Sequence, residues 1–113
     1  NRGNQLQALR LADQAEERLL ATRLELQSQL YAARETLEAS RKQAVQLSER
    51  VLPTAQIAYE AASKGFALGK FGYLDVLDAQ RSLFDVRSQY LDQLLATHRA
   101  STDIERLLGT TAK

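Results

Sequence analysis

Carboxylates spaced along the second half of the sequence are the residues best placed to do chemistry. Asp75 and Asp78 follow a glycine-rich stretch, and Asp78, Asp85 and Asp92 recur every seven residues, which places them on one face of a helix. Such a row predicts either an acidic wall toward water or simply a solvated face balanced by neighbouring arginines. For Asp75 and Asp78 a structural interpretation also stands, because the helix dipole favours carboxylates in the first turns of a helix.

Catalytic and metal-binding chemistry finds no support in the sequence. His98 is the only imidazole, and Cys and Met are absent, so the three or four ligands that a transition metal takes cannot be assembled. A chain of two packed helices also has no interior in which a nucleophile and its base could be shielded from water. We therefore expect no enzyme activity, no cofactor and no metal site. Basic residues alternate with acids at a net charge of +1, which predicts no nucleic-acid partner.

The glycine-rich stretch GFALGKFGYLDVLDAQ, Gly65 to Gln80, carries apolar side chains where a turn is expected. These side chains predict either a clasp that folds back between the helix ends or an outward docking surface on a rigid scaffold. Glycines at the turn would let another backbone approach closely. The candidate docking residues of this tip are Phe66, Leu68, Gly69, Lys70 and Phe71.

Composition favours an all-α chain. Ala, Leu, Gln, Arg, Glu and Ser dominate the 113 residues, and aromatic residues make up only 6%. No apolar run reaches the ~18 residues that a membrane-spanning helix needs. Since no initiator Met precedes Asn1, we expect the chain to be an excerpt or a processed product.

Apolar residues at alternating spacings of three and four predict two long helices. A capping box of Asn4 and Gln7 predicts the start of the first, and Pro53 predicts a kink through which the heptad register continues unchanged. Its seam is Leu19, Arg23, Leu26, Leu30, Ala33, Leu37, Ser40, Ala44, Leu47, Val51, Thr54, Ala58 and Ala61, with a second row at Leu24, Tyr31, Val45, Leu52 and Tyr59. The second helix has its seam at Val76, Ala79, Leu83, Val86, Tyr90, Gln93, Thr97, Ala100, Ile104 and Leu107, and Gly109 predicts its end.

The two helices are expected to form a long antiparallel hairpin of coiled-coil type, as one domain over 1–113. Helix one covers about 4–63, the tip 64–72 and helix two 73–108, so the first arm is the longer. The unmatched third of helix one bears Leu6, Leu9, Leu19, Leu20 and Leu24. Because a long exposed apolar stripe is sticky, we expect another chain or another part of the protein to cover it, and the excerpt to self-associate.

A family resemblance rests on four stretches. GFALGKFGYLDVLDAQRSLFDVRSQYLDQL and the later ERLLG, Glu105 to Gly109, resemble the end of the second structural repeat of TolC-like outer membrane efflux proteins. NRGN at Asn1 to Asn4 and VLPTAQIAYEAASKGF before the turn resemble the heavy-metal branch, whose members export cobalt, zinc, cadmium, copper or silver.

The resemblance implies a trimeric outer-membrane channel in which this chain is the second periplasmic hairpin of each subunit. It also implies a passive exit duct powered by an inner-membrane transporter, with the tip meeting a periplasmic adaptor protein. Asp75 and Asp78 would line the constriction of the tunnel, and Phe71 stands where some relatives place a charged residue that tethers neighbouring helices. The alternative is a structural coiled-coil module that tethers other proteins; the hairpin of an adaptor itself would require flanking β-rich segments, which this sequence lacks.

Overall fold

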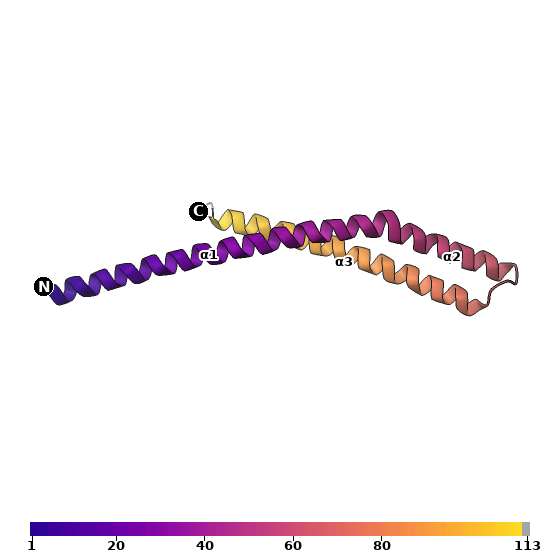
Figure 1. The fold of residues 1–113 in the computed structure, drawn as a ribbon, viewed down its shortest axis with the longest axis horizontal. Coiled ribbons are helices and arrows are strands. Elements are labelled where there is room, and N and C mark those ends of the chain that lie inside the picture. The colour runs from indigo at the N-terminus through magenta and orange to yellow at the C-terminus, as the bar shows by residue number, and fades with distance from the viewer. Residues whose placement is uncertain (112–113) are drawn as a thin grey trace.

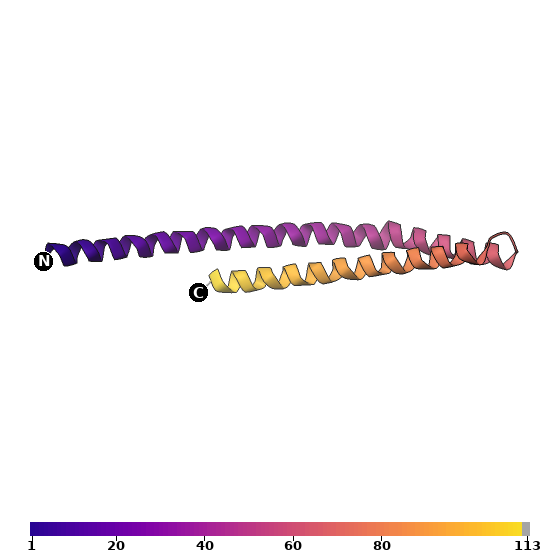
Figure 2. The ribbon, with the colours of Figure 1, turned by 90° about the horizontal axis from the view of Figure 1, so that it is seen from below.

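Helix-favouring residues with a three-four apolar repeat fold here into two antiparallel rods. In the computed structural model, which describes residues 1–111, α1 spans Arg2–Gln46, the π-helical turn η1 spans Leu47–Val51, α2 spans Leu52–Ala67 and α3 spans Tyr73–Thr111. The first three continue one another, and α3 runs back beside them (Figures 1 and 2). The molecule measures 97 × 23 × 14 Å. The prediction of an all-α hairpin with a longer first arm is confirmed.

The first helix begins earlier than the capping box predicted. The Asn1 side chain caps α1, because its Oδ1 accepts a hydrogen bond of 3.2 Å from the backbone amide of Gly3. Asn4 and Gln7 therefore lie inside the helix, and their proposed capping box is wrong. Asn1 at the N-cap accepts a hydrogen bond from an amide of the first turn that would otherwise be unpaired, so Asn4 is not needed as a cap.

Helix α3 packs along the seam that the sequence predicted. Each predicted seam position from Val76 to Leu107 is buried or half-buried. Leu83, Ala100 and Leu107 are the best covered, with 5%, 4% and 2% of their surface exposed. Dense contacts at these points, rather than a thick core, hold the two rods together.

On the first arm the seam is correct from Leu26 to Leu47 and wrong beyond it. Val51, which the prediction placed in the seam, is 41% exposed, whereas Leu52 and Tyr59 of the second row are half-buried. The π turn inserts one residue, so the packed face shifts to the next residue along. Figure 1 shows that the arm also changes direction where α1 meets α2.

One buried polar contact interrupts the apolar seam. Thr97 Oγ1 lies 2.8 Å from Ser40 Oγ, and Ser40 in turn donates to the carbonyl of Leu37 at 3.1 Å. Ser40 is only 4% exposed. Because each hydroxyl has a partner, this pair can be buried without the penalty of an unmade hydrogen bond.

Two predicted ends differ from the observed ones. Helix α2 continues to Ala67, four residues beyond 63, and α3 continues through Gly109 to Thr111, so Gly109 is not a stop. Glycine inside a helix costs about 1 kcal/mol relative to alanine, which does not suffice to end it.

The first part of α1 extends beyond α3. Every residue from 1 to 25 is exposed, and the leucines there, such as Leu9 and Leu19, are 62% and 54% exposed. Figure 2 shows this part of the helix running past the end of α3. The predicted unpaired apolar stripe is therefore present in the structure.

Candidate functional site

The tip is a tight reversal built on one carbonyl group. The Gly65 carbonyl accepts hydrogen bonds from the amides of Lys70 and Phe71, at 2.7 and 3.2 Å. Gly69 has a φ of +74°, in the left-handed region where a side chain is strained. Glycine at 69 is thus required by the turn itself, independently of any partner.

Two aromatic contacts close the base of the tip. The Phe71 ring lies against Gly65, and a Cβ atom at position 65 would overlap that ring. The rings of Phe66 and Tyr73 pack with centroids 5.5 Å apart at an angle of 55°. Phe66 and Phe71 remain 46% and 49% exposed, so about half of each ring serves the clasp and half faces outward.

The most exposed apolar side chains at the tip are two leucines. Leu68 is 71% exposed and Leu74 is 74% exposed, one on each side of the turn, and Lys70 lies exposed between them. Leu74 was absent from the predicted docking residues. Its signal in the sequence was its position outside the three-four seam that continues through Val76.

Asp75 has a local structural role. Its Oδ2 accepts a 3.1 Å hydrogen bond from the Gly72 amide, and its own amide donates to the Gly72 carbonyl at 3.1 Å. The bond to the Asp75 carboxylate is the N3 half of a capping box and caps the start of α3, whereas the return bond goes to a backbone carbonyl because Gly72 has no side chain. Asp78 is exposed one turn further along the same helix.

Helix α3 carries two unlike rows on its outer side. Asp78, Asp85 and Asp92 are all exposed, and their seven-residue repeat continues with Arg99 and Arg106. The residues just before the aspartates are Leu77, Phe84 and Leu91; Phe84 and Leu91 are 67% and 63% exposed. Because one residue turns a helix by about 100°, a charged row and an apolar row run side by side. The charged row is acidic near the tip and basic toward the other end.

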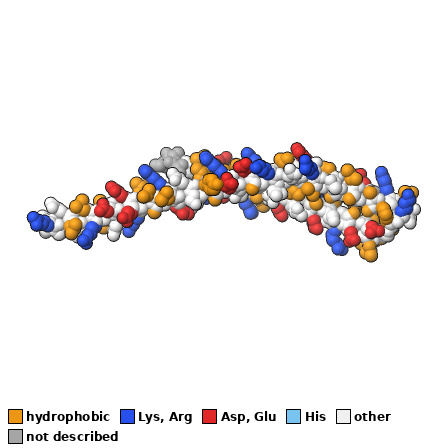
Figure 3. Space-filling view, in the orientation of Figure 1, with side chains coloured by type: hydrophobic (Ala, Val, Ile, Leu, Met, Phe, Trp, Pro, Cys, Tyr) orange, Lys and Arg blue, Asp and Glu red, His pale blue; other side chains and the backbone are white. Residues whose placement is uncertain are grey.

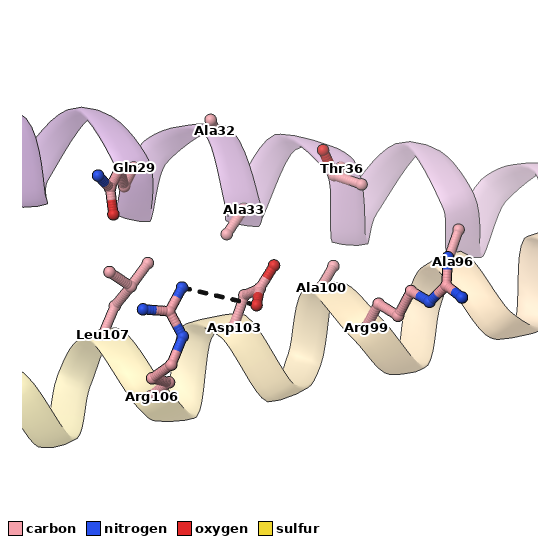
Figure 4. Close-up of a pocket in the computed structure, with 10 residues that line it drawn as sticks. All are labelled: Gln29, Ala32, Ala33, Thr36, Ala96, Arg99, Ala100, Asp103, Arg106 and Leu107. Atoms are coloured by element: carbon pink, nitrogen blue, oxygen red, sulfur yellow. Dashed lines mark ion pairs between the residues drawn. The ribbon is translucent and has the colours of Figure 1, made fainter.

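A shallow groove of about 440 Å³ lies between α1 and α3 on the charged side (Figure 4). It exists because small side chains, among them Ala32, Ala33, Ala96 and Ala100, line it from both helices. Asp103 pairs with Arg106 at 3.7 Å within the groove. An open groove of this kind cannot exclude water from a reaction, so it has the geometry of a packing surface rather than of an active site.

One face of the described rod carries charges of both signs without a large block of either. Figure 3 shows acidic, basic and hydrophobic side chains interspersed along this face of the rod. Among residues 1–111 no three His, Cys, Asp or Glu side chains gather in a way that could hold a metal ion. Within the same range, no helix is both long and apolar enough to cross a bilayer. His98 lies exposed on α3.

Comparison with known proteins gives two significant matches. The family model for "Outer membrane efflux protein" matches residues 1–110. The cobalt-zinc-cadmium resistance protein CzcC of Cupriavidus metallidurans is 49% identical over 109 residues, which make up 96% of this chain and 26% of that protein. The chain thus spans about a quarter of the length of this relative. No solved structure gave a significant match.

Proposed function

The chain belongs to the outer membrane efflux protein family, and we propose that it forms part of the wall of a periplasmic tunnel beneath a trimeric outer-membrane channel. In this role it is a segment of a passive exit duct, and an inner-membrane transporter supplies the energy through an adaptor protein. Proteins of the family are channels, so the expectation that the chain is not an enzyme is confirmed by family membership.

The observation that carries the proposal is the large apolar surface that the hairpin leaves uncovered. The total accessible surface of the hairpin, polar and apolar together, is 9040 Å² for 12.6 kDa, about 1.5 times what a compact protein of this mass exposes. Exposed leucines, aromatics and valines lie along all the helices, beside the seam and on the unpaired arm. A wall helix that packs on neighbours at both sides needs such surface, whereas an isolated rod in water does not.

The two rows of α3 suggest how the hairpin is oriented in that wall. The apolar row with Phe84 and Leu91 packs against a neighbouring helix, and the charged row beginning at Asp78 faces the water-filled tunnel. Near the tip that row is acidic, which favours the passage of cations. Asp78 is the stronger candidate for lining the constriction, because Asp75 already accepts the Gly72 amide.

The exported substrate is proposed from the relative. CzcC is named for resistance to cobalt, zinc and cadmium, and we extend this substrate class, divalent heavy-metal ions, to the protein that contains this chain. Cells that lose the protein should become sensitive to these ions and retain more of them. Unchanged sensitivity and unchanged cell-associated metal would remove the metal assignment while leaving the channel role open to other substrates.

The tip is proposed as the docking surface for a periplasmic adaptor protein. Leu68 and Leu74 supply exposed apolar area, and Lys70 supplies a charge between them. Phe66 and Phe71 hold the turn in shape with their inner halves and extend the apolar surface with their outer halves. Gly69 lets the partner's backbone approach closely.

Site-specific crosslinking in cells tests the docking surface. A thiol crosslinker is attached to Lys70→Cys in the full-length protein, and Gln89→Cys on the exposed middle of α3 is the matched control. Capture of a periplasmic adaptor from position 70 and not from position 89 is the expected result. If the folded, labelled protein captures no adaptor from position 70, the tip is only a clasp, and the alternative of a structural coiled-coil module takes precedence.

A further inference from the structure

The turn Leu47–Val51 is the one place in residues 2–67 where the first arm departs from the α-helix. There the Leu52 amide donates to the carbonyl of Leu47, five residues back instead of four. A single π turn holds one extra residue, and one residue corresponds to about 100° of helix rotation. All of α2 is therefore rotated by about 100° relative to a straight continuation of α1.

Burial on either side of the turn follows this rotation. Before it, the seam passes through Ala44 and Leu47, which are 8% and 6% exposed; beyond it, Ala62 is 9% exposed. The positions that a straight helix would place in the seam are all exposed: Val51, Thr54, Ala58 and Ala61. The sequence thus offers two rows on α2, a mostly small one and a bulkier one with Leu52 and Tyr59. The packed row is the bulkier one.

The residues after the turn suit this arrangement. Pro53 has no amide hydrogen, and in a regular α-helix its ring would crowd the carbonyl four residues back. Thr54 Oγ1 donates to the carbonyl of Arg50 at 2.7 Å, so a carbonyl within the turn gains a side-chain partner. Proline and threonine at these positions therefore favour the widened turn over a straight helix.

The other end of α2 depends on the same rotation. Gly65 is buried, and the Phe71 ring occupies the space that a Cβ atom at 65 would fill. If α1 continued into α2 as a straight α-helix, each position on α2 that faces α3 would hold the residue that is one earlier in the sequence. The side chain of Lys64 would then meet the Phe71 ring, and the aromatic clasp could not form as observed.

We infer that the π turn Leu47–Val51, which Pro53 favours but does not by itself maintain, is a built-in one-residue insertion that sets which row of α2 faces α3 and thereby places Gly65 against the Phe71 ring. The π turn and the contact between Gly65 and Phe71 therefore depend on the same alignment of α2 against α3, although they lie at opposite ends of α2. The inference concerns the hairpin itself and does not depend on the proposed transport role.

Two thiol pairs in the full-length protein report the register on each side of the turn. Ser40→Cys with Thr97→Cys replaces hydroxyls that lie 2.8 Å apart between α1 and α3, and disulfide formation reports the register of α1 against α3. Gln56→Cys with Arg87→Cys replaces side chains that are hydrogen-bonded at 3.3 Å on the α2 side, and a short bifunctional thiol reagent reports it. The offset pair Ala55→Cys with Arg87→Cys would link as fast as the native pair only if α2 relaxed to the straight register.

Deletion of Glu49 is the decisive perturbation, made in a Pro53→Ala background so that the resulting straight helix contains no proline. The deletion removes the spare residue, so both thiol pairs should link as in Pro53→Ala alone, and the offset pair should stay about tenfold slower because linking needs close approach. Deletion of Asp92 is the matched control. It removes one exposed carboxylate from the regular helix α3, between Arg87 and Thr97, and should slow one of the two pairs about tenfold.

Three results would overturn the inference. The first is that deleting Glu49 disrupts a thiol pair as deleting Asp92 does, or prevents the protein from accumulating. The second is that the offset pair links as fast as Gln56→Cys with Arg87→Cys in the parent protein. The third is that Pro53→Ala alone fails to accumulate, because packing of the bulkier row should hold the register without the proline. Each result is independent of whether an adaptor docks at the tip.

Discussion

Replacing Gly65 with alanine should destabilise the tip, although alanine is the better helix former. Gly65 lies near the end of α2, where helix propensity alone favours alanine by about 1 kcal/mol. The new methyl group, however, occupies the space of the Phe71 ring. About half of that ring is buried, and losing this burial costs about 1 kcal/mol.

Displacement of the ring also disturbs the backbone beside it. The amides of Lys70 and Phe71 both donate to the Gly65 carbonyl, and each such hydrogen bond contributes about 1 kcal/mol. The net expected loss for Gly65→Ala is about 1 to 2 kcal/mol of local stability, after the gain in helix propensity is subtracted.

Amide hydrogen exchange at positions 70 and 71 measures this local stability directly, because these amides are released when the turn opens. Protection should fall about 5- to 30-fold in Gly65→Ala, after correction for intrinsic exchange rates. In a Phe71→Ala background the ring is gone, so the same Gly65→Ala change should raise protection by up to about fivefold. If Gly65→Ala raises protection in both backgrounds, the ring does not rest on position 65 and the reasoning is refuted.

Three further outcomes are expected for the 113-residue chain. Leu83→Ala should lower the free energy of unfolding by about 2 to 4 kcal/mol because Leu83 is 5% exposed. The neighbouring Phe84→Ala, at a 67% exposed position, should change the free energy of unfolding by less than about 0.5 kcal/mol. Urea unfolding followed by circular dichroism distinguishes the two variants, and equal losses would contradict the assigned seam. Ser40→Ala should cost less than about 1 kcal/mol in the same assay, because Thr97 Oγ1 still lies 2.8 Å from a backbone carbonyl, and a larger loss would show that the Ser40–Thr97 bond itself holds the helices. Sedimentation velocity should show dimers or larger species formed through the region Leu6–Leu24, and a monomer over a wide concentration range would count against this.

The path of α3 was predictable because nothing interrupts its repeat. From Val76 to Leu107 the three-four spacing holds without proline, and the helix contains only one glycine, Gly109, after the seam. A regular period fixes the buried face of a helix by geometry alone. The same logic succeeded on α1 from Leu26 to Leu47, where the helix is also regular.

The path of α2 was not predictable from the period, because one inserted residue moves every later side chain. Both available rows keep the three-four spacing, so periodicity does not choose between them. The bulk of Leu52 and Tyr59 against the small Ala58 and Ala61 was the available signal, since larger apolar side chains gain more from burial. Pro53 marked the place of the disturbance but not its size.

The sequence raised two alternatives for the tip; the structure shows the contacts of the clasp, and docking stays a prediction. Phe71 and Phe66 make clasp contacts, and Leu68 is exposed enough for docking. For Asp75 the capping contact was foreseeable from helix-end chemistry, and a pore-facing role for Asp75 or Asp78 stays a prediction. Docking and pore-facing contacts depend on neighbouring chains, which the physics of a single chain does not describe.

The tip also favours one order of assembly for the hairpin. Closing a chain loop costs more entropy as the loop lengthens. The Lys70–Gly65 hydrogen bond closes a very short loop, whereas the Ser40–Thr97 contact joins residues 57 apart in sequence. Pairing that starts at the tip and proceeds toward the free arm is therefore the route of lowest entropic cost. Changes at Gly65 or Gly69 should then slow folding, whereas changes near Leu107 should mainly speed unfolding.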